Sequence, residues 1–153
     1  MIVVIAEPEE LDLVRELGLE HNQIIITGVG AINVIRALAK IPKDEVIFNV
    51  GYCGSNNIPI GTKVAVSSVG TMHEGVEFYE DKLYCYIYGN GDRYKKIAPC
   101  YTATQFVEKT NIKEDCVFDM ELAYIAAMFE RVYSIKFVSD NLNLEDYRKK
   151  IST

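Results

Sequence analysis

The strongest constraint on the fold is a set of short apolar runs that alternate with segments of helical periodicity. The first three runs, all rich in β-branched residues, are IVVIA (2–6), QIIIT (23–27) and EVIFNVG (45–51). Between them, Pro8 opens a helical segment that ends at Gly18, and a second segment, AINVIRALAK, stops before Pro42. Runs of this kind are typical of buried strands, so the order predicts a mostly parallel sheet covered by helices.

The middle of the chain has a different pattern. TKVAVSSVG (62–70) and LYCYIY (83–88) alternate between side-chain types, and GNGD (89–92) supplies turn residues. We therefore expect residues 62–101 to form an antiparallel or mixed extension of the same sheet. Tyr84, Tyr86 and Tyr88 would then share one face, which is either an interface or a layer of the core.

The C-terminal part returns to the first pattern. We expect a helix near 104–110, a strand near 115–118, a helix at 120–130, a strand at 132–138, a loop at 139–143 and a terminal helix. The predicted fold class is α/β, with three layers and a mostly parallel or mixed central sheet flanked by helices. We expect residues 1–153 to form one domain, since their number suits a single core.

Composition excludes several classes of function. The net charge is -6, and the densest basic group, RYKK (93–96), is too small for a nucleic-acid footprint. The 4 cysteines form no CxxC pair, and the 2 histidines stand alone, so we expect no metal and no cofactor. The N-terminus lacks an export signal, and no apolar window reaches the roughly 18 residues of a membrane span. We therefore expect a cytoplasmic protein with reduced thiols.

Five loops should gather at the carboxyl ends of the strands, where open α/β sheets bind ligands. They are AEPEE (6–10), TGVGAIN (27–33), VGYCGSNN (50–57), FDMEL (118–122) and VSDNLN (138–143). TGVGAIN fails the dinucleotide pattern because Asn33 stands at its third glycine position. Its backbone forms either a plain tight turn or a set of N–H donors facing a small polar ligand. The same choice applies to VGYCG.

Four acidic residues in these loops are candidates for a chemical role. Asp119 is explained as a helix cap, but Glu121 lies on a largely apolar helix face and needs hydrogen-bond donors. A ligand with two adjacent hydroxyls would provide them. Asp140 belongs either to a polar turn or to a site where an apolar wall keeps it protonated as a general acid. With Glu10, these groups supply a diol clamp, a proton donor and a water-activating base, which is what cleavage of an N-glycosidic bond requires.

Five segments, taken in their order along the chain, form a longer sequence pattern. They are IVVIAEPEEL (2–11), IIITGVGAINVIRAL (24–38), VIFNVGYCGSNNIPIGTKVAVSS (46–68), FDMELAYIA (118–126) and FVSDNLN (137–143). In this order the chain resembles a short member of the purine nucleoside phosphorylase and methylthioadenosine/S-adenosylhomocysteine nucleosidase superfamily. The resemblance implies a nucleoside phosphorylase-like fold that binds a purine nucleoside, usually as a homo-oligomer, with a dimer expected here.

For the sugar, the resemblance implies that Glu121 holds the ribose 2′ and 3′ hydroxyls and that Met120 packs against the ring. It also implies that two glycine loops approach the ribose or a phosphate. Their residues are Gly28, Gly30, Gly51, Tyr52 and Gly54.

For the base, the resemblance implies that Phe106 stacks on the purine and that Val107 lies alongside it. Asp140, oriented by Ser139, would protonate or hydrogen-bond the base at N7. Glu10 would activate the attacking water.

The chain departs from the family pattern in ways that bear on the reaction. Tyr52 stands where a Ser or Thr is usual, no phosphate-clamping Arg is evident, and Lys136 is the nearest cation before the Ser–Asp pair. Family members are also noticeably longer. We therefore expect hydrolysis of a purine nucleoside such as methylthioadenosine or S-adenosylhomocysteine. The alternatives are a phosphorylase that uses phosphate and a nucleoside-binding protein without catalysis.

Overall fold

The computed structural model describes residues 1–73, 76–83 and 96–152. The expected turn at 89–92 and the face shared by Tyr84, Tyr86 and Tyr88 lie outside these residues. The described strands are β1 (Ile2–Ile5), β2 (Gln23–Ile26), β3 (Val46–Ser55), β4 (Lys63–His73), β5 (Val76–Leu83), β6 (Lys96–Ala103), β7 (Val117–Asp119) and β8 (Arg131–Asp140). The helices are the 3-10 turn η1 (Pro8–Glu10), α1 (Leu11–Glu16), α2 (Ala31–Leu38), α3 (Leu122–Met128) and α4 (Leu144–Ser152).

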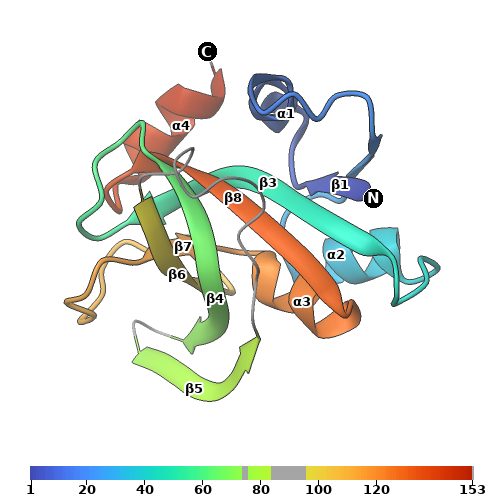
Figure 1. The fold of residues 1–153 in the computed structure, drawn as a ribbon. Coiled ribbons are helices and arrows are strands. Elements are labelled where there is room, and N and C mark those ends of the chain that lie inside the picture. Colours follow the sequence, from blue (N-terminus) through green and yellow to red (C-terminus); the bar gives the residue numbers. More distant parts are fainter. Residues whose placement is uncertain (74–75, 84–95, 153) are drawn as a thin grey trace.

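All the described strands join one mixed sheet. β1 pairs in parallel with β2 and β3, and β3 pairs in parallel with β8 along most of its length. β4 pairs antiparallel with β5 and β8 but parallel with β6, so the predicted mixed extension is confirmed. The α/β class with a mostly parallel or mixed sheet is likewise confirmed, and Figure 1 shows the helices outside this sheet.

Five of the strands close into a ring. β3 pairs with β8, β8 with β4, β4 with β6, and β6 with β7. β7 then returns to the carboxyl end of β3, where Gly54 and Ser55 face Phe118 and Val117. Side chains that point into this ring are removed from water on every side, which matters for the site.

Helices cover the sheet on two sides (Figure 1). On one side, Val34 and Leu38 of α2 and Leu122 and Ile125 of α3 pack against even-numbered residues of β1 such as Val4. On the other side, Leu13 and Val14 of α1 pack against the odd-numbered residues of β1, Val3 and Ile5. Phe48 of β3 belongs to the same cluster. The alternation of β1 between the two clusters shows that both of its faces are buried, as its unbroken apolar sequence predicts.

Two expectations from the sequence are wrong. The run 23–27 was expected to be a buried strand, but β2 ends the sheet with β1 as its partner, and Ile26 is 43% exposed. Residues 104–110 form no helix. Instead, this segment turns inward, and Val107 packs with Tyr101 and Phe118 in a third apolar cluster. The two apolar residues of the segment are adjacent, so they cannot form the stripe that a helix needs to dock.

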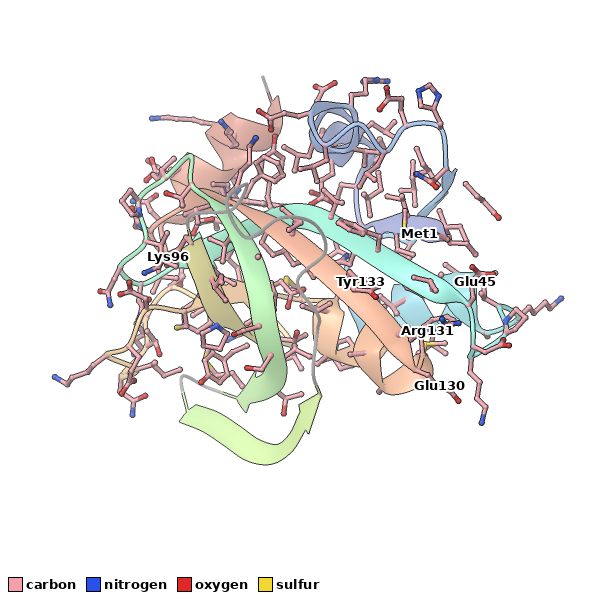
Figure 2. All side chains as sticks on the ribbon, viewed as in Figure 1. Met1, Glu45, Lys96, Glu130, Arg131 and Tyr133 are labelled. Carbon is pink, nitrogen blue, oxygen red and sulfur yellow. The ribbon has the colours of Figure 1, made fainter. Side chains whose placement is uncertain are left out.

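Charged groups mark the end of the sheet where β1, β3 and β8 begin. The N-terminal ammonium of Met1 lies 3.2 Å from Glu45 Oε1, and Arg131 donates a hydrogen bond to the Asp44 carbonyl (Figure 2). Because these three strands are parallel, their carboxyl ends meet at the opposite end of the sheet, where the loops with the candidate residues lie.

Candidate functional site

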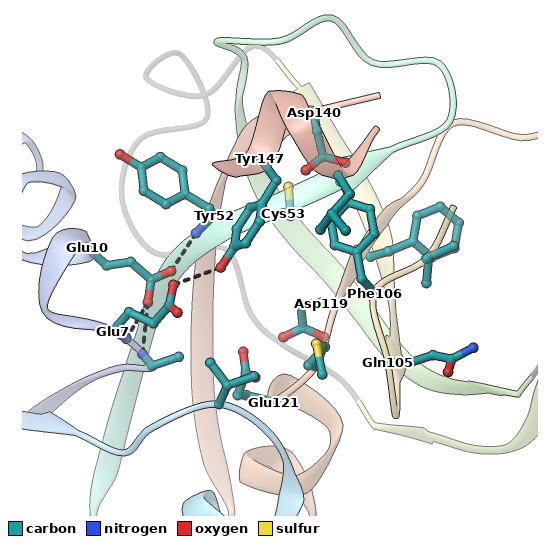
Figure 3. Close-up of a pocket in the computed structure, with 17 residues that line it drawn as sticks. Glu7, Glu10, Tyr52, Cys53, Gln105, Phe106, Asp119, Glu121, Asp140 and Tyr147 are labelled. Carbon is teal, nitrogen blue, oxygen red and sulfur yellow. Dashed lines mark hydrogen bonds between the residues drawn. The ribbon is translucent and has the colours of Figure 1, made fainter. Parts of the chain in front are cut away.

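The carboxyl ends of β1, β3 and β8 border a cavity of about 260 Å³ (Figure 3). Segments 105–107 and 118–121 and the helix α4 complete its wall. Eight of the residues proposed from the sequence line it: Glu10, Tyr52, Gly54, Phe106, Val107, Met120, Glu121 and Asp140. Residues more than a hundred positions apart in the sequence are thus brought to one site.

Glu10 is buried and held by backbone donors from two segments. Its Oε1 accepts hydrogen bonds from the N–H groups of Ala6 and Glu7, each at 2.9 Å, and its Oε2 accepts one from Tyr52 at 2.7 Å. Burial raises the pKa of Glu10, while the positive charge of Lys136 opposes the rise. A carboxylate has about four acceptor positions, so one remains available to a water molecule.

Glu121 is also buried, and its Oε2 accepts a hydrogen bond from the Gly30 N–H at 2.9 Å. Burial and the neighbouring negative charge of Asp119 raise the pKa of Glu121 to about 8. The described backbone donates one hydrogen bond to the Glu121 side chain, whereas it donates three to Glu10. The prediction that Glu121 is buried and short of donors therefore agrees with its surroundings.

Asp119 does more than cap a helix. Its Oδ2 accepts the Leu122 N–H at 2.8 Å, as a cap would, but it also lies 3.0 Å from the Nζ of Lys136. Lys136 is 1% exposed, and its ion pair holds the pKa of Asp119 below the usual value despite burial. β7 and β8 are not neighbours in the sheet, so this ion pair crosses the interior of the ring.

The contact of Lys136 with Asp119 was not expected from the sequence. There, Lys136 was only the cation nearest to the Ser–Asp pair, with no role assigned. Its signal was a lone lysine inside the otherwise apolar run IKFV, since buried lysines occur where a carboxylate pairs with them.

Asp140 ends β8 and is buried. Its Oδ1 accepts a hydrogen bond from the Ser139 hydroxyl at 2.8 Å, and its Oδ2 accepts one from the Leu142 N–H at 3.0 Å. Ser139 Oγ also lies 3.2 Å from the Cys53 carbonyl. Burial raises the pKa of Asp140, which favours the protonated form that a general acid requires. Ser139 itself does not line the cavity but orients the carboxyl that does.

The apolar part of the wall includes the three residues proposed from the sequence, Phe106, Val107 and Met120, together with Ala6, Val29, Phe118 and Leu144. The Phe106 ring lies 5.7 Å from that of Tyr147, centroid to centroid, in a tilted arrangement. Tyr147 of α4 was not identified from the sequence, which contains many tyrosines and no motif around this one. Its hydroxyl donates a hydrogen bond to Glu7 Oε2 at 2.8 Å.

The glycines fall into two groups. A Cβ at Gly51 would lie 2.6 Å from Glu10 Oε2, and one at Gly54 would lie 2.8 Å from Asp140 Oδ2, so both positions exclude a side chain in favour of a carboxylate. Gly28 and Gly30 have positive φ, each 88°, and neither lines this cavity. The Gly28 N–H donates to the Ala6 carbonyl, and the Gly30 N–H donates to Glu121. These two N–H groups of the loop are therefore engaged by the protein, while Val29 between them lines the cavity.

Within residues 1–73, 76–83 and 96–152, no helix is long and apolar enough to cross a membrane. No cluster of three or more His, Cys, Asp and Glu side chains in that part of the chain is arranged to hold a metal ion.

No protein-family model and no curated protein sequence matches the chain. Solved structures do match. An MTAN from Chlamydia trachomatis bound to MTA has a TM-score of 0.74 at 18% identity, over 99% of this chain and 90% of that one. A 5′-methylthioadenosine/S-adenosylhomocysteine nucleosidase from Neisseria meningitidis in complex with methylthio-immucillin-A has a TM-score of 0.71 at 15% identity, over 98% and 90%. That from Helicobacter pylori has a TM-score of 0.70 at 13% identity, over 98% and 90%.

The fold is therefore that of the methylthioadenosine/S-adenosylhomocysteine nucleosidases, and the nucleoside phosphorylase-like architecture expected from the sequence is confirmed. The match spans 90% of each of these chains, although the resemblance implied noticeably longer family members.

Proposed function

We propose that this protein is a nucleosidase that hydrolyses the N-glycosidic bond of a purine nucleoside. The observation that carries the proposal is the convergence of Glu10, Glu121 and Asp140 on one cavity with an apolar wall. Proteins of the same fold are described with MTA, with adenine and with methylthio-immucillin-A, so methylthioadenosine and S-adenosylhomocysteine are the first substrates to test. We further propose that residues 1–153 act as one nucleoside phosphorylase-like domain without a cofactor.

In this proposal the purine lies against Phe106 and Val107, and the buried carboxyl of Asp140 donates its proton to N7. The bond between C1′ and the base breaks with its electron pair passing to the base. A water molecule bonds to C1′ and gives its proton to Glu10. Ser139 keeps Asp140 in position, because its hydroxyl and the Leu142 N–H hold both carboxyl oxygens.

Glu121 is proposed to hold the 2′ and 3′ hydroxyls, with Met120 against the sugar. Two hydroxyls would supply the donors that this buried carboxylate lacks. Gly51 and Gly54 allow β3 to approach Glu10 and Asp140, and Gly30 fixes the Glu121 carboxylate from behind.

The charge of the cavity favours hydrolysis over phosphorolysis. No Arg or Lys is among the described residues that line it, and its ionisable side chains include four Asp or Glu besides Glu7. A phosphate ion would therefore find no cation in contact, and it would lie near Asp119, whose pKa is held below the usual value by Lys136 despite burial. Lys136 is engaged beneath the cavity by Asp119.

The experiment that tests the proposal is release of free adenine from methylthioadenosine or S-adenosylhomocysteine, with and without phosphate. We expect release in both conditions. Release that depends on phosphate would assign the protein to the phosphorylases, and binding without release would leave a nucleoside-binding protein.

Asp140→Asn should lower turnover by about 10²–10⁴-fold, the usual contribution of a general acid, while binding persists. Asp12→Asn, on the exposed side of α1, is the matched control and should retain wild-type turnover. A wild-type rate in Asp140→Asn would exclude it as the proton donor.

Glu121→Ala should weaken binding of ribosides by more than it weakens binding of the free base. An equal loss for both would contradict its role as a diol clamp.

We also propose that the protein works in the cytoplasm as a homo-oligomer, with a dimer as the simplest form. Exposed apolar residues on and beside α2 support this, among them Ile32 at 74% and Ile35 at 51% exposure. Sedimentation at several protein concentrations would test the assembly, and a monomer throughout would refute it.

A further inference from the structure

One pair of side chains at the cavity has no part in the proposed reaction. The Tyr147 hydroxyl donates a hydrogen bond to Glu7 Oε2 at 2.8 Å, and both residues line the cavity. The pair joins two distant parts of the chain, the loop after β1 and the helix α4, across the space in front of Glu10 (Figure 3). The Tyr147 hydroxyl and the Glu10 N–H, which donates to the Glu7 side chain in a capping box, use about two of its four acceptor positions, so others remain at the cavity wall.

The place of this pair follows from the proposed positions of the base and the ribose diol. The base lies at the Phe106 and Asp140 end, and the diol lies at Glu121. The 5′ carbon leaves C4′ on the face of the ribose ring opposite the 2′ and 3′ hydroxyls. Of the remaining polar side chains in the wall, Glu10 and Asp119 are held by several protein donors. Gln105 is next to Phe106 at the proposed base end, and the Tyr52 ring packs against the apolar cluster of α1 and β1. Glu7 and Tyr147 thus remain as the polar groups proposed for the 5′ end of the substrate.

We propose that Glu7, held in place by Tyr147, selects nucleosides whose 5′ substituent carries a hydrogen-bond donor. This inference rests on the proposed nucleosidase function and narrows its substrate class. Two kinds of group share the required chemistry: a 5′-hydroxyl, as in adenosine, and the ammonium of an amino-acid substituent, as in S-adenosylhomocysteine. A 5′-methylthio group has no donor.

The physical basis is the cost of leaving a partly buried carboxylate against an apolar group. A methylthio group would displace water from Glu7 and return no hydrogen bond, whereas a hydroxyl or ammonium would replace the lost water. Glu7 is half-buried, so the discrimination is expected to be about ten- to a hundredfold, below that of a fully enclosed site.

The test compares kcat/KM for adenosine, S-adenosylhomocysteine and methylthioadenosine in the wild-type protein and four variants. Glu7→Leu removes the acceptor and should raise the ratio of methylthioadenosine to adenosine by about tenfold or more. Tyr147→Phe keeps the ring against Phe106 but frees Glu7, and should shift the ratio in the same direction by less. Glu9→Gln alters an exposed neighbour in the same turn and should leave all ratios unchanged.

Glu7→Gln separates the two donor groups. An amide oxygen still accepts from a hydroxyl but lacks the charge that attracts an ammonium. A loss confined to S-adenosylhomocysteine identifies the ammonium as the group that Glu7 binds. Unchanged kcat/KM for both nucleosides in Glu7→Gln, with a loss for adenosine in Glu7→Leu, identifies the 5′-hydroxyl.

The inference and the proposed function fail in different ways. If bases are released but methylthioadenosine is preferred and the Glu7 variants leave the ratios unchanged, the inference is refuted and the nucleosidase stands. If nucleosides bind without base release, dissociation constants replace kcat/KM in the same comparison. If none of the three nucleosides binds, the proposed function is refuted and the inference with it.

Discussion

Replacing Lys136 by methionine should destabilise the protein strongly, because it removes the cation from an ion pair inside the strand ring. Methionine has a similar length and keeps most of the apolar packing of the lysine stem. Lys136 is 1% exposed, and its Nζ lies 3.0 Å from Asp119 Oδ2, so solvent cannot replace it. Removing one partner of a buried pair costs about 3–5 kcal/mol. Asp119 keeps the Thr102 hydroxyl and the Leu122 N–H, which places the expected loss near the lower end of this range.

The assay is urea unfolding followed by circular dichroism at pH 7, with Lys63→Met as the matched control. Lys63 lies 3.8 Å from Glu16 and is 41% exposed in its side chain, so its loss should cost no more than about 1 kcal/mol. The difference between Lys136→Met and wild type should shrink at pH 5. Without the cation the pKa of Asp119 rises above its unfolded value, and such a group stabilises the fold as pH falls.

Two results would refute this reasoning. One is a loss below about 1 kcal/mol for Lys136→Met, equal to that of the exposed control. The other is additivity in a cycle with Asp119→Asn, since residues in direct contact should show a coupling of at least about 0.5 kcal/mol.

Three further predictions concern the carboxylates. Burial raises the pKa of Glu121 to about 8, so its contribution to the free energy of unfolding is complete below its unfolded pKa and is lost as pH rises toward 8. Glu121→Gln should flatten the plot of unfolding free energy against pH, measured by urea unfolding. Equal slopes in the variant and the wild-type protein would contradict this. Gly54→Ala should push Asp140 aside and lower kcat by about 10²-fold, the effect of a misplacement of about 1 Å. Gly51→Ala should displace Glu10 with a similar loss, and wild-type turnover in either alanine variant would refute the close approach.

The elements that depend on local sequence could be predicted well. The apolar runs located the first strands, since burial of both faces of a strand leaves an unbroken apolar sequence. Pro8 and Gly18 located the bounds of the first helical segment. The exposure of β2 could not be predicted this way, because an edge strand and a central strand in a parallel sheet have similar sequences. Closure of the ring depends on pairing between distant strands, which has no local signal.

Among the site residues, burial of Glu121 was predicted from its helix face, and the capping contact of Asp119 was predicted from its position before the helix. What the sequence could not show was that Asp119 and Lys136 meet across the ring. Their strands share β3 as a neighbour without pairing to each other, so no pattern of adjacent residues encodes the contact. Tyr147 illustrates the same limit, since its partner Glu7 lies near the other end of the chain.

The position of β8 has a consequence for how the protein folds. Among the described strands β8 comes after all the others along the chain, yet it lies between β3 and β4, and it pairs Val46 with Arg131. Such long-range pairing raises contact order and slows folding. Until β8 inserts, β3 and β4 present open apolar edges that favour aggregation. Since Lys136, Ser139 and Asp140 belong to β8, a chain arrested before this step has neither a closed ring nor these side chains of the proposed site.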